Sequence, residues 1–249
     1  MQMTLLNNDF LIVFGLLLAV VAFLYSSVGH GGASGYLALM AIFAFPISVM
    51  KPSALLLNLF VSGISFFFYY KKDFFKLKLF YPFAITSVPA AFIDGMIPLE
   101  NSFYKILLGI VLILAALRLF GFFNSKEKES VKINIPIAMG IGFGIGLLSG
   151  MLGIGGGIIL SPILLLLGWA TLKETAAISS LFIFVNSVAG LSGYFMEDKT
   201  FPTESFYLVP IAVFGGMLGA YYGSGYFSNK VLKYVLATVI LLASVKLIV

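Results

Sequence analysis

Apolar runs long enough to cross a lipid bilayer recur along almost all of this 249-residue chain. Most approach or exceed the roughly 18 residues that mark a transmembrane helix. Hydrophobic residues make up 61% of the chain and charged residues 10%, so a soluble fold has too little polar surface to cover it. The sequence therefore predicts an all-α polytopic membrane protein. The ten expected segments are 10–28, 33–45, 53–70, 79–97, 102–120, 135–151, 155–168, 175–195, 205–223 and 230–249.

Composition also excludes several kinds of site. The chain has no cysteine and a single histidine, His30, so disulfides, thiol chemistry and Cys-ligated clusters are excluded, and a His-based metal site is not expected. We expect no cofactor. The net charge of +5 comes from lysines and an arginine spread over short loops, which favours the lipid bilayer over nucleic acid as the partner. The N-terminus lacks a basic n-region, so the first segment is expected to remain in the mature protein.

The two halves of the chain resemble each other. The tetrapeptide GHGG at Gly29 matches GIGG at Gly153, and KPSALLLNLF from Lys51 matches KETAAISSLF from Lys173. The last apolar segments of the two halves also match. Matches in one order indicate an internal duplication, which is typical of secondary transporters. The expected units are an N-terminal repeat (1–123), a cytoplasmic linker (124–134) and a C-terminal repeat (135–249).

The second segment of each half is short. About 13 residues of helix measure about 20 Å, less than the roughly 30 Å hydrocarbon core. Segments one and two therefore form a re-entrant hairpin with a glycine tip, or both cross obliquely. Either way the pair returns the chain to its starting side, and three further crossings make the halves inverted repeats of five segments.

The loop charges test this topology. Inverted halves place 11 basic residues on one side and 4 on the other, whereas fusing segments one and two gives 10 against 5. The positive-inside rule prefers the inverted arrangement, with the central linker cytoplasmic and both termini outside.

Glycine runs interrupt the apolar pattern at 29–32 and 153–157. Non-helical backbone at membrane depth survives only where protein buries it or where it lines a wet cavity, and paired breaks indicate a transport site. A new helix starts after each break, and its N-terminus offers free N–H donors to an anion. The predicted substrate-binding residues are Gly29, His30, Gly31, Gly32, Ser34, Asn58, Gly153, Gly155, Gly156, Gly157, Ser161 and Asn186.

Each of these residues also has a structural interpretation. Glycine in membrane helices often permits close packing, and the stretches that start at Gly142 and Gly215 fit that role. His30 is a proton carrier, a hydrogen-bond donor to the anion, or a packing residue. Serines at helix starts can act as caps, and Asn58 and Asn186 can bond between helices.

The stretch GMLGIGGGIILSPILLLLG, from Gly150, resembles the signature of the sulfite exporter TauE/SafE family, and GHGGASGYLALM resembles its first-half version. The resemblance spans nearly the whole chain. It implies a secondary transporter, not an enzyme, that moves sulfite, sulfonates and related anions across the bacterial inner membrane. His30 departs from the usual first-half tip and leaves the anion open. Family members are often described with seven or eight spans, so the ten segments correspond to eight on that count.

The sequence also leaves two other functions open, an intramembrane protease and a passive anion channel. The tetrapeptide GASG matches the GxSG of rhomboid-type intramembrane proteases, with Ser34 as nucleophile. A base must come from another helix, yet the chain offers only His30, four residues earlier, and the second half has Ile158 in place of the serine. A passive anion channel built on the same halves is the stronger alternative. A coupled proton, and the choice between monomer and homodimer, stay open.

Overall fold

The structure is a computed structural model that describes residues 8–97, 100–121, 132–196 and 201–225, with short helical stretches within 237–248. Its secondary structure in these ranges is helical, without strands. The all-α membrane architecture expected from the sequence is confirmed. The helices are α1 (Asn8–Ser26), α2 (Ala33–Ile42), α3 (Ile47–Tyr70), α4 (Leu77–Met96), α5 (Asn101–Phe120), α6 (Ile135–Leu152), α7 (Gly157–Leu166), α8 (Leu172–Phe195), the 3-10 helix η2 (Thr203–Tyr207) and α9 (Leu208–Gly225).

Nine of the ten expected segments overlap one of these α-helices. Most of the tenth segment and most of the linker lie outside the described residues. Five helical stretches in the described ranges are long and apolar enough to cross a membrane: Ile47–Tyr70, Leu77–Met96, Ile135–Leu152, Leu172–Phe195 and Ser205–Gly225. Helices α2 and α7 contain only 10 residues each.

Helices α2 and α7 end earlier than the apolar pattern predicts, because both close with the same kind of turn. The Phe45 N–H bonds to the Met40 carbonyl at 2.8 Å, and the Trp169 N–H bonds to the Leu164 carbonyl at 3.0 Å. Such six-to-one bonds stop a helix and need a left-handed residue inside the turn. Ala44, with φ 56°, fills that place after α2, and Gly168, with φ 65°, fills it after α7.

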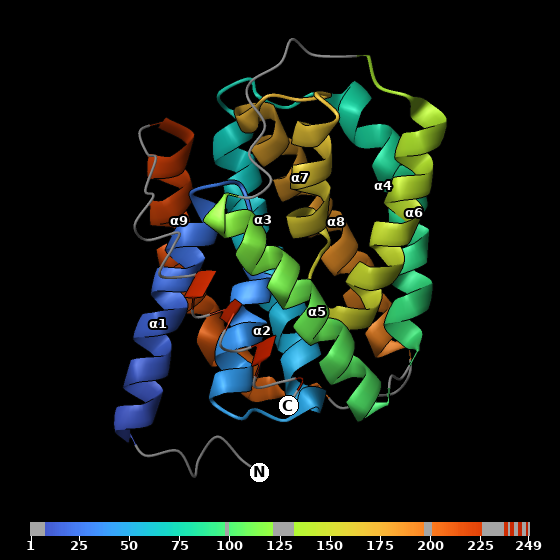
Figure 1. Ribbon diagram of the computed structural model, residues 1–249. Helices are drawn as coiled ribbons and strands as arrows, with labels where there is room; N and C mark the ends of the chain where they lie inside the picture. The colour runs from blue at the N-terminus through green and yellow to red at the C-terminus, as the bar shows by residue number, and fades with distance from the viewer. Residues whose placement is uncertain are drawn as a thin grey trace.

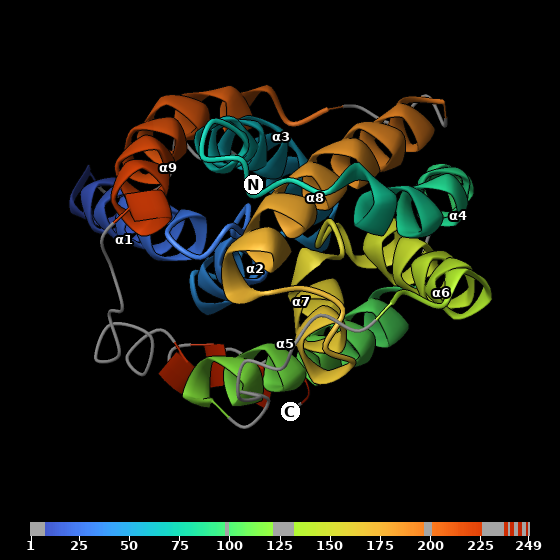
Figure 2. The ribbon, with the colours of Figure 1, turned by 90° about the horizontal axis from the view of Figure 1, so that it is seen from above.

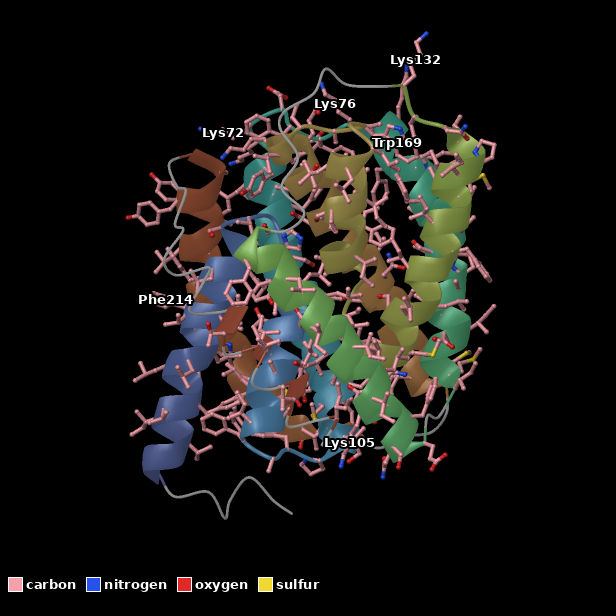
Figure 3. The ribbon with its side chains drawn as sticks, in the orientation of Figure 1. Lys72, Lys76, Lys105, Lys132, Trp169 and Phe214 are labelled. Carbon is pink, nitrogen blue, oxygen red and sulfur yellow. The ribbon has the colours of Figure 1, made fainter. Side chains whose placement is uncertain are left out.

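The first two helices of each half enter the molecule and return to the same end (Figure 1). Lys72, Lys76, Lys132 and Trp169 lie at one end and Lys105 at the opposite end (Figure 3). Helix α1 begins at the Lys105 end and α2 returns there, whereas α6 begins at the Lys132 end and α7 returns to that end (Figures 1 and 3). Helices α1 and α2 are therefore not one fused span. The positive-inside rule predicts that the Lys132 end faces the cytoplasm, and this orientation stays a prediction.

Helix partners are exchanged between the halves. Helix α1 packs along α9, and α6 packs along α4, so the first helix of each half contacts the fourth helix of the other. Helices α2, α3, α7 and α8 lie between these two pairs (Figure 2). A two-fold axis through the centre would produce this exchange, and such an axis stays a prediction.

Both pairs are held by glycine stripes, as the sequence predicts for these stretches. On α6, a Cβ at Gly142 or Gly150 would stand 2.5 or 2.6 Å from the α4 carbonyl oxygens of Phe83 and Ala91. Glycine here lets two backbones approach more closely than any side chain would allow. The same contact recurs where Gly215, Gly219 and Gly223 of α9 meet the backbone of Ala19, Phe23 and Ser27.

Candidate functional site

The two glycine breaks meet in the interior of the molecule. Both α2 and α7 begin between the two ends of the bundle (Figure 1). His30, in the first break, contacts Ser161 of α7, with 2.8 Å between Nε2 and Oγ. Gly31 of the first break and Gly155 of the second both abut the side chains of Asn58 and Ile183. Helices α3 and α8 thus each supply one side chain to the point where the breaks converge.

The break glycines adopt backbone conformations that other residues rarely accept. Gly29, Gly32, Gly153, Gly155 and Gly156 have φ between 71° and 100°. A Cβ on Gly29 would also overlap the backbone of Ala176 on α8. The runs are therefore required both by the left-handed turns and by close approach to α8.

Asn58 connects the breaks and has an unpaired donor. Its Oδ1 accepts the Ala33 N–H at 3.1 Å, which fixes the orientation of the amide because an N–H only donates. The other amide atom, Nδ2, is buried without a hydrogen-bond partner among the described residues. It lies 2.9 Å from where a Cβ on Gly155 would stand, and the equally unpaired hydroxyl of Ser187 lies 3.2 Å from that point. Buried polar groups without partners are rare and indicate a missing ligand or water.

The helix starts add backbone donors to this place. In α7 the first N–H that bonds to a carbonyl is that of Ile159, and in α2 it is that of Tyr36. The preceding N–H groups of each helix have no backbone acceptor in the described ranges. One of them, that of Ala33, donates instead to the side-chain oxygen of Asn58. Two helix N-termini and the Asn58 amide therefore bring donors, not acceptors, to the meeting point.

His30 joins the first break to α7 and α8 through a chain of hydrogen bonds. It is 2% exposed, and its Nδ1 must donate to the Val28 carbonyl, 2.8 Å away. Ser161 Oγ lies 2.8 Å from His30 Nε2, 2.8 Å from the Gly157 carbonyl and 2.7 Å from Ser179 Oγ. A neutral His30 accepts from Ser161. A protonated His30 donates to Ser161, which then donates to Gly157 at the start of α7.

Two predicted residues are placed differently from the rest. The Ser34 hydroxyl bonds to Tyr25 OH at 2.7 Å and not to His30, so the described residues do not form the dyad that a protease would need. Asn186 is buried, and its amide nitrogen donates to the Phe182 carbonyl at 2.8 Å, a bond within α8. The structure thus gives Ser34 and Asn186 local partners and brings His30, Asn58 and Ser161 together.

Three residues at the breaks were not predicted. Tyr36 OH is buried and unpaired in the described part of the chain, 2.6 Å from where a Cβ on Gly32 would stand. Ser187 and Ile183 both touch Gly155. Tyr36 lies four residues after Gly32, a spacing that brings a helical side chain back over the helix start, and this is the signal that would have found it.

Comparison with known proteins identifies the family. The family model described as sulfite exporter TauE/SafE matches residues 13–247. The chain belongs to the sulfite exporter TauE/SafE family. The probable membrane transporter protein y4hK of Sinorhizobium fredii is 35% identical over 234 residues, which cover 92% of this chain and 94% of that protein. No solved structure matches.

Family membership confirms the resemblance read from the glycine signatures and makes this chain a multi-pass membrane transporter. The described residues of this TauE/SafE protein hold no cluster of three or more His, Asp or Glu side chains that would bind a metal. What they bring to the centre of the membrane domain is a set of hydrogen-bond donors.

Proposed function

We propose that this TauE/SafE protein is a secondary transporter of a small sulfur-containing anion, such as sulfite, a sulfonate or thiosulfate, across the bacterial inner membrane. The anion binds where the two glycine breaks meet. The observation that carries the proposal is the unpaired Nδ2 of Asn58, buried between the starts of α2 and α7.

The sign of the charge follows from the donors. An anion buried away from water costs many kcal/mol unless donors and positive potential replace its hydration. Each helix N-terminus contributes about half an elementary charge, and the site adds the Asn58 amide, with the Ser187 hydroxyl beside it. These groups present positively polarised hydrogens, which would repel a cation. The site therefore favours an anion without any buried lysine or arginine.

A sulfur oxyanion suits several donors that converge from different helices. Its charge is spread over several oxygens, each an acceptor, so the α2 start, the α7 start and Asn58 can each bond to a different oxygen. The family description, sulfite exporter, agrees with this chemistry.

The repeat organisation is part of the same proposal. We propose two inverted halves, 1–123 and 135–249, joined by the cytoplasmic linker 124–134. The opposite courses of α1–α2 and α6–α7 and the exchanged partners of α1 and α6 support it. A site between inverted halves can be exposed to either side of the membrane in turn, which is the usual basis of alternating access.

Replacing Asn58 by aspartate is the sharpest test. Asn58→Asp keeps an oxygen that can accept the Ala33 N–H and turns the free donor into a negative acceptor beside Gly155. We expect sulfite counterflow in proteoliposomes to be lost and sulfite to stop raising the melting temperature of the purified protein. Asn101→Asp, which places the same charge at an exposed position, is the control and should behave as wild type.

A second variant covers the case in which Asn58→Asp does not fold. Ser187→Ala removes a hydroxyl that has no bond to lose within the described residues, and it should weaken sulfite binding about tenfold, the loss of a hydrogen bond to a charged group. Unchanged sulfite binding in both variants would contradict the site. A conductive leak without counterflow in the wild type would make the protein a channel.

A further inference from the structure

Two lysines differ from all others that the structure describes. Lys51 and Lys173 are partly buried, whereas the remaining described lysines are exposed. A partly buried ammonium is costly in a membrane protein and usually has a role. The exposed group is Lys71, Lys72, Lys76, Lys78, Lys105 and Lys132.

The two lysines occupy corresponding places in the two halves. Lys51 begins KPSALLLNLF in the first turns of α3, and Lys173 begins KETAAISSLF in the first turn of α8. Helix α3 starts at the Lys105 end, and α8 starts at the Trp169 end (Figures 1 and 3). The positive-inside rule predicts that the Trp169 end faces the cytoplasm. The lysines therefore lie toward opposite ends of the molecule.

Lys51 lies beside the second break. A Cβ on Gly153 would stand 3.0 Å from the Lys51 carbonyl oxygen and 3.1 Å from its Cγ. The charge of Lys51 acts on the carboxylate of Asp94, which is 3% exposed. One oxygen of that carboxylate, Oδ2, has no hydrogen-bond partner in the described ranges. The outer lysine thus has in its neighbourhood a buried carboxyl group, one oxygen of which has no hydrogen-bond partner among the described residues.

Lys173 is linked through Tyr69 to the chain just before the first break. Its Nζ donates to the Gly223 carbonyl at 2.7 Å and to the Ser224 carbonyl at 3.3 Å, at the end of α9. It also lies 5.8 Å from the ring centre of Tyr69, whose hydroxyl bonds to the Ser27 carbonyl where the break begins. The inner lysine is balanced by carbonyl dipoles and an aromatic ring, without a full negative charge among these contacts.

We propose that Lys51 and Lys173 are the anion-recruiting residues of two entrances, Lys51 on the outer side and Lys173 on the cytoplasmic side. The inference rests on the proposed anion transport. Each ammonium draws the anion toward the adjacent glycine break and exchanges its present partner for an anion oxygen. Lysine suits this task because it is a flexible point charge with three donors, whereas the donors of the breaks are fixed.

The neighbours of the two lysines make the entrances unequal. An anion that approaches Lys51 also meets the carboxyl group of Asp94, whereas an anion that approaches Lys173 meets carbonyl dipoles and the Tyr69 ring. Loss of the lysine charge should therefore cost more at the cytoplasmic entrance.

Sided transport measurements test the proposal. Sulfite uptake is measured in right-side-out and inverted membrane vesicles that carry Lys51→Gln or Lys173→Gln. We expect Lys51→Gln to raise KM several-fold for entry from the outer face only. Lys173→Gln should raise KM about tenfold for entry from the cytoplasmic face only, as loss of one partly screened charge interaction predicts. Lys→Arg at either position should restore much of the affinity.

Controls separate this role from a structural one. Lys105→Gln and Lys72→Gln remove a charge from the same two ends at exposed positions and should leave KM unchanged. An equal rise of KM in both vesicle orientations, or an unchanged KM with only a lower melting temperature, would show that the lysines merely join helices and would overturn the proposal. If wild-type protein neither transports sulfite nor is stabilised by it, the proposed function fails instead.

Discussion

Glycine serves two different purposes in this protein, and its neighbours distinguish them. The stripe glycines of α6 and α9 face backbone carbonyls of the adjacent helix. Several break glycines face polar side chains, namely Asn58, Tyr36 and Ser187, and most have positive φ. The amide nitrogen of Asn58 and the hydroxyls of Tyr36 and Ser187 have no hydrogen-bond partner in the described part of the chain. The same residue type thus holds helices together in one region and, in the other, lies beside unpaired donors that we propose bind the ligand.

This comparison predicts different losses when a methyl group is added. In a stripe, the new Cβ meets a backbone that cannot rotate away, so two helices must separate and the whole fold loses stability. At Gly31 of the first break, the Cβ meets the side chains of Asn58 and Ile183, which can shift, so the fold persists and the site changes.

The largest expected effect is on stability, in a stripe. Gly219→Ala places a Cβ against the Phe23 backbone, 2.8 Å from its carbonyl carbon, and should separate α1 from α9. Overpacking of this kind costs about 1–3 kcal/mol and should lower the melting temperature by about 5 °C. Thermal unfolding of the purified protein, followed by size-exclusion chromatography, measures it.

Gly140→Ala is the matched control. Gly140 lies in α6 with nothing within 4 Å of its added Cβ. Alanine favours a helix over glycine by about 1 kcal/mol, so this variant should be as stable as wild type or more stable. Equal melting temperatures for Gly219→Ala and Gly140→Ala would show that the close glycine contacts between α1 and α9 do not stabilise the fold.

The second expected effect is on binding, in a break. Gly31→Ala brings a Cβ against Asn58 Oδ1 and displaces the amide that caps Ala33 and presents Nδ2 to Gly155. Sulfite affinity should fall about tenfold or more, as expected when a hydrogen bond to a charged group is lost. The melting temperature should fall less than in Gly219→Ala. Isothermal titration measures the loss of sulfite affinity, and thermal unfolding of the same samples measures the loss of stability.

Gly144→Ala is the control for this second comparison. Gly144 lies in α6 with open space around an added Cβ, so its affinity for sulfite should equal that of wild type. A Gly31→Ala protein that loses stability as strongly as Gly219→Ala but keeps its affinity would make the break another packing contact.

Much of the fold could be predicted because its signals are local. The lengths of the apolar runs predicted the helices, and the glycine runs predicted the breaks between α1 and α2 and between α6 and α7. The four-residue spacing of Gly142, Gly146 and Gly150 gave the packing face of α6. The early end of α2 was missed because its left-handed turn residue is Ala44, which carries no sequence signal for φ 56°.

The site was predicted only in part because its contacts are long-range. His30 and Ser161 are 131 positions apart, and no periodicity says that they touch. Asn58 and Asn186 looked alike as buried amides, yet Asn58 bonds to the first break and Asn186 bonds within its own helix. Ser187, next to Asn186, is the residue that meets Gly155. A shift of one residue turns a helical side chain by about 100°, and tertiary packing decides which one faces the site.

The smallest expected effect concerns His30, which belongs to the first break but bonds to the second half. Its Nδ1 already donates to Val28, so protonation changes Nε2 from an acceptor of the Ser161 hydrogen into a donor. Protonation adds a positive charge beside the α7 start and releases the Ser161 hydrogen toward the Gly157 carbonyl. The neighbouring hydroxyls of Ser161 and Ser179 do not ionise near neutral pH, so they do not change charge when His30 gains a proton.

Protonation of His30 should therefore strengthen anion binding, so the affinity for methanesulfonate should rise as the solution becomes more acidic. His30→Gln keeps a group able to bond to Ser161 but cannot gain a proton, so its affinity should stay the same as the solution becomes more acidic. The titration compares wild type and His30→Gln with methanesulfonate, whose charge is constant from pH 5 to 8, because sulfite itself changes charge there. A wild-type affinity that stays flat, or a pH dependence that survives in His30→Gln, would limit His30 to joining the first break to α7.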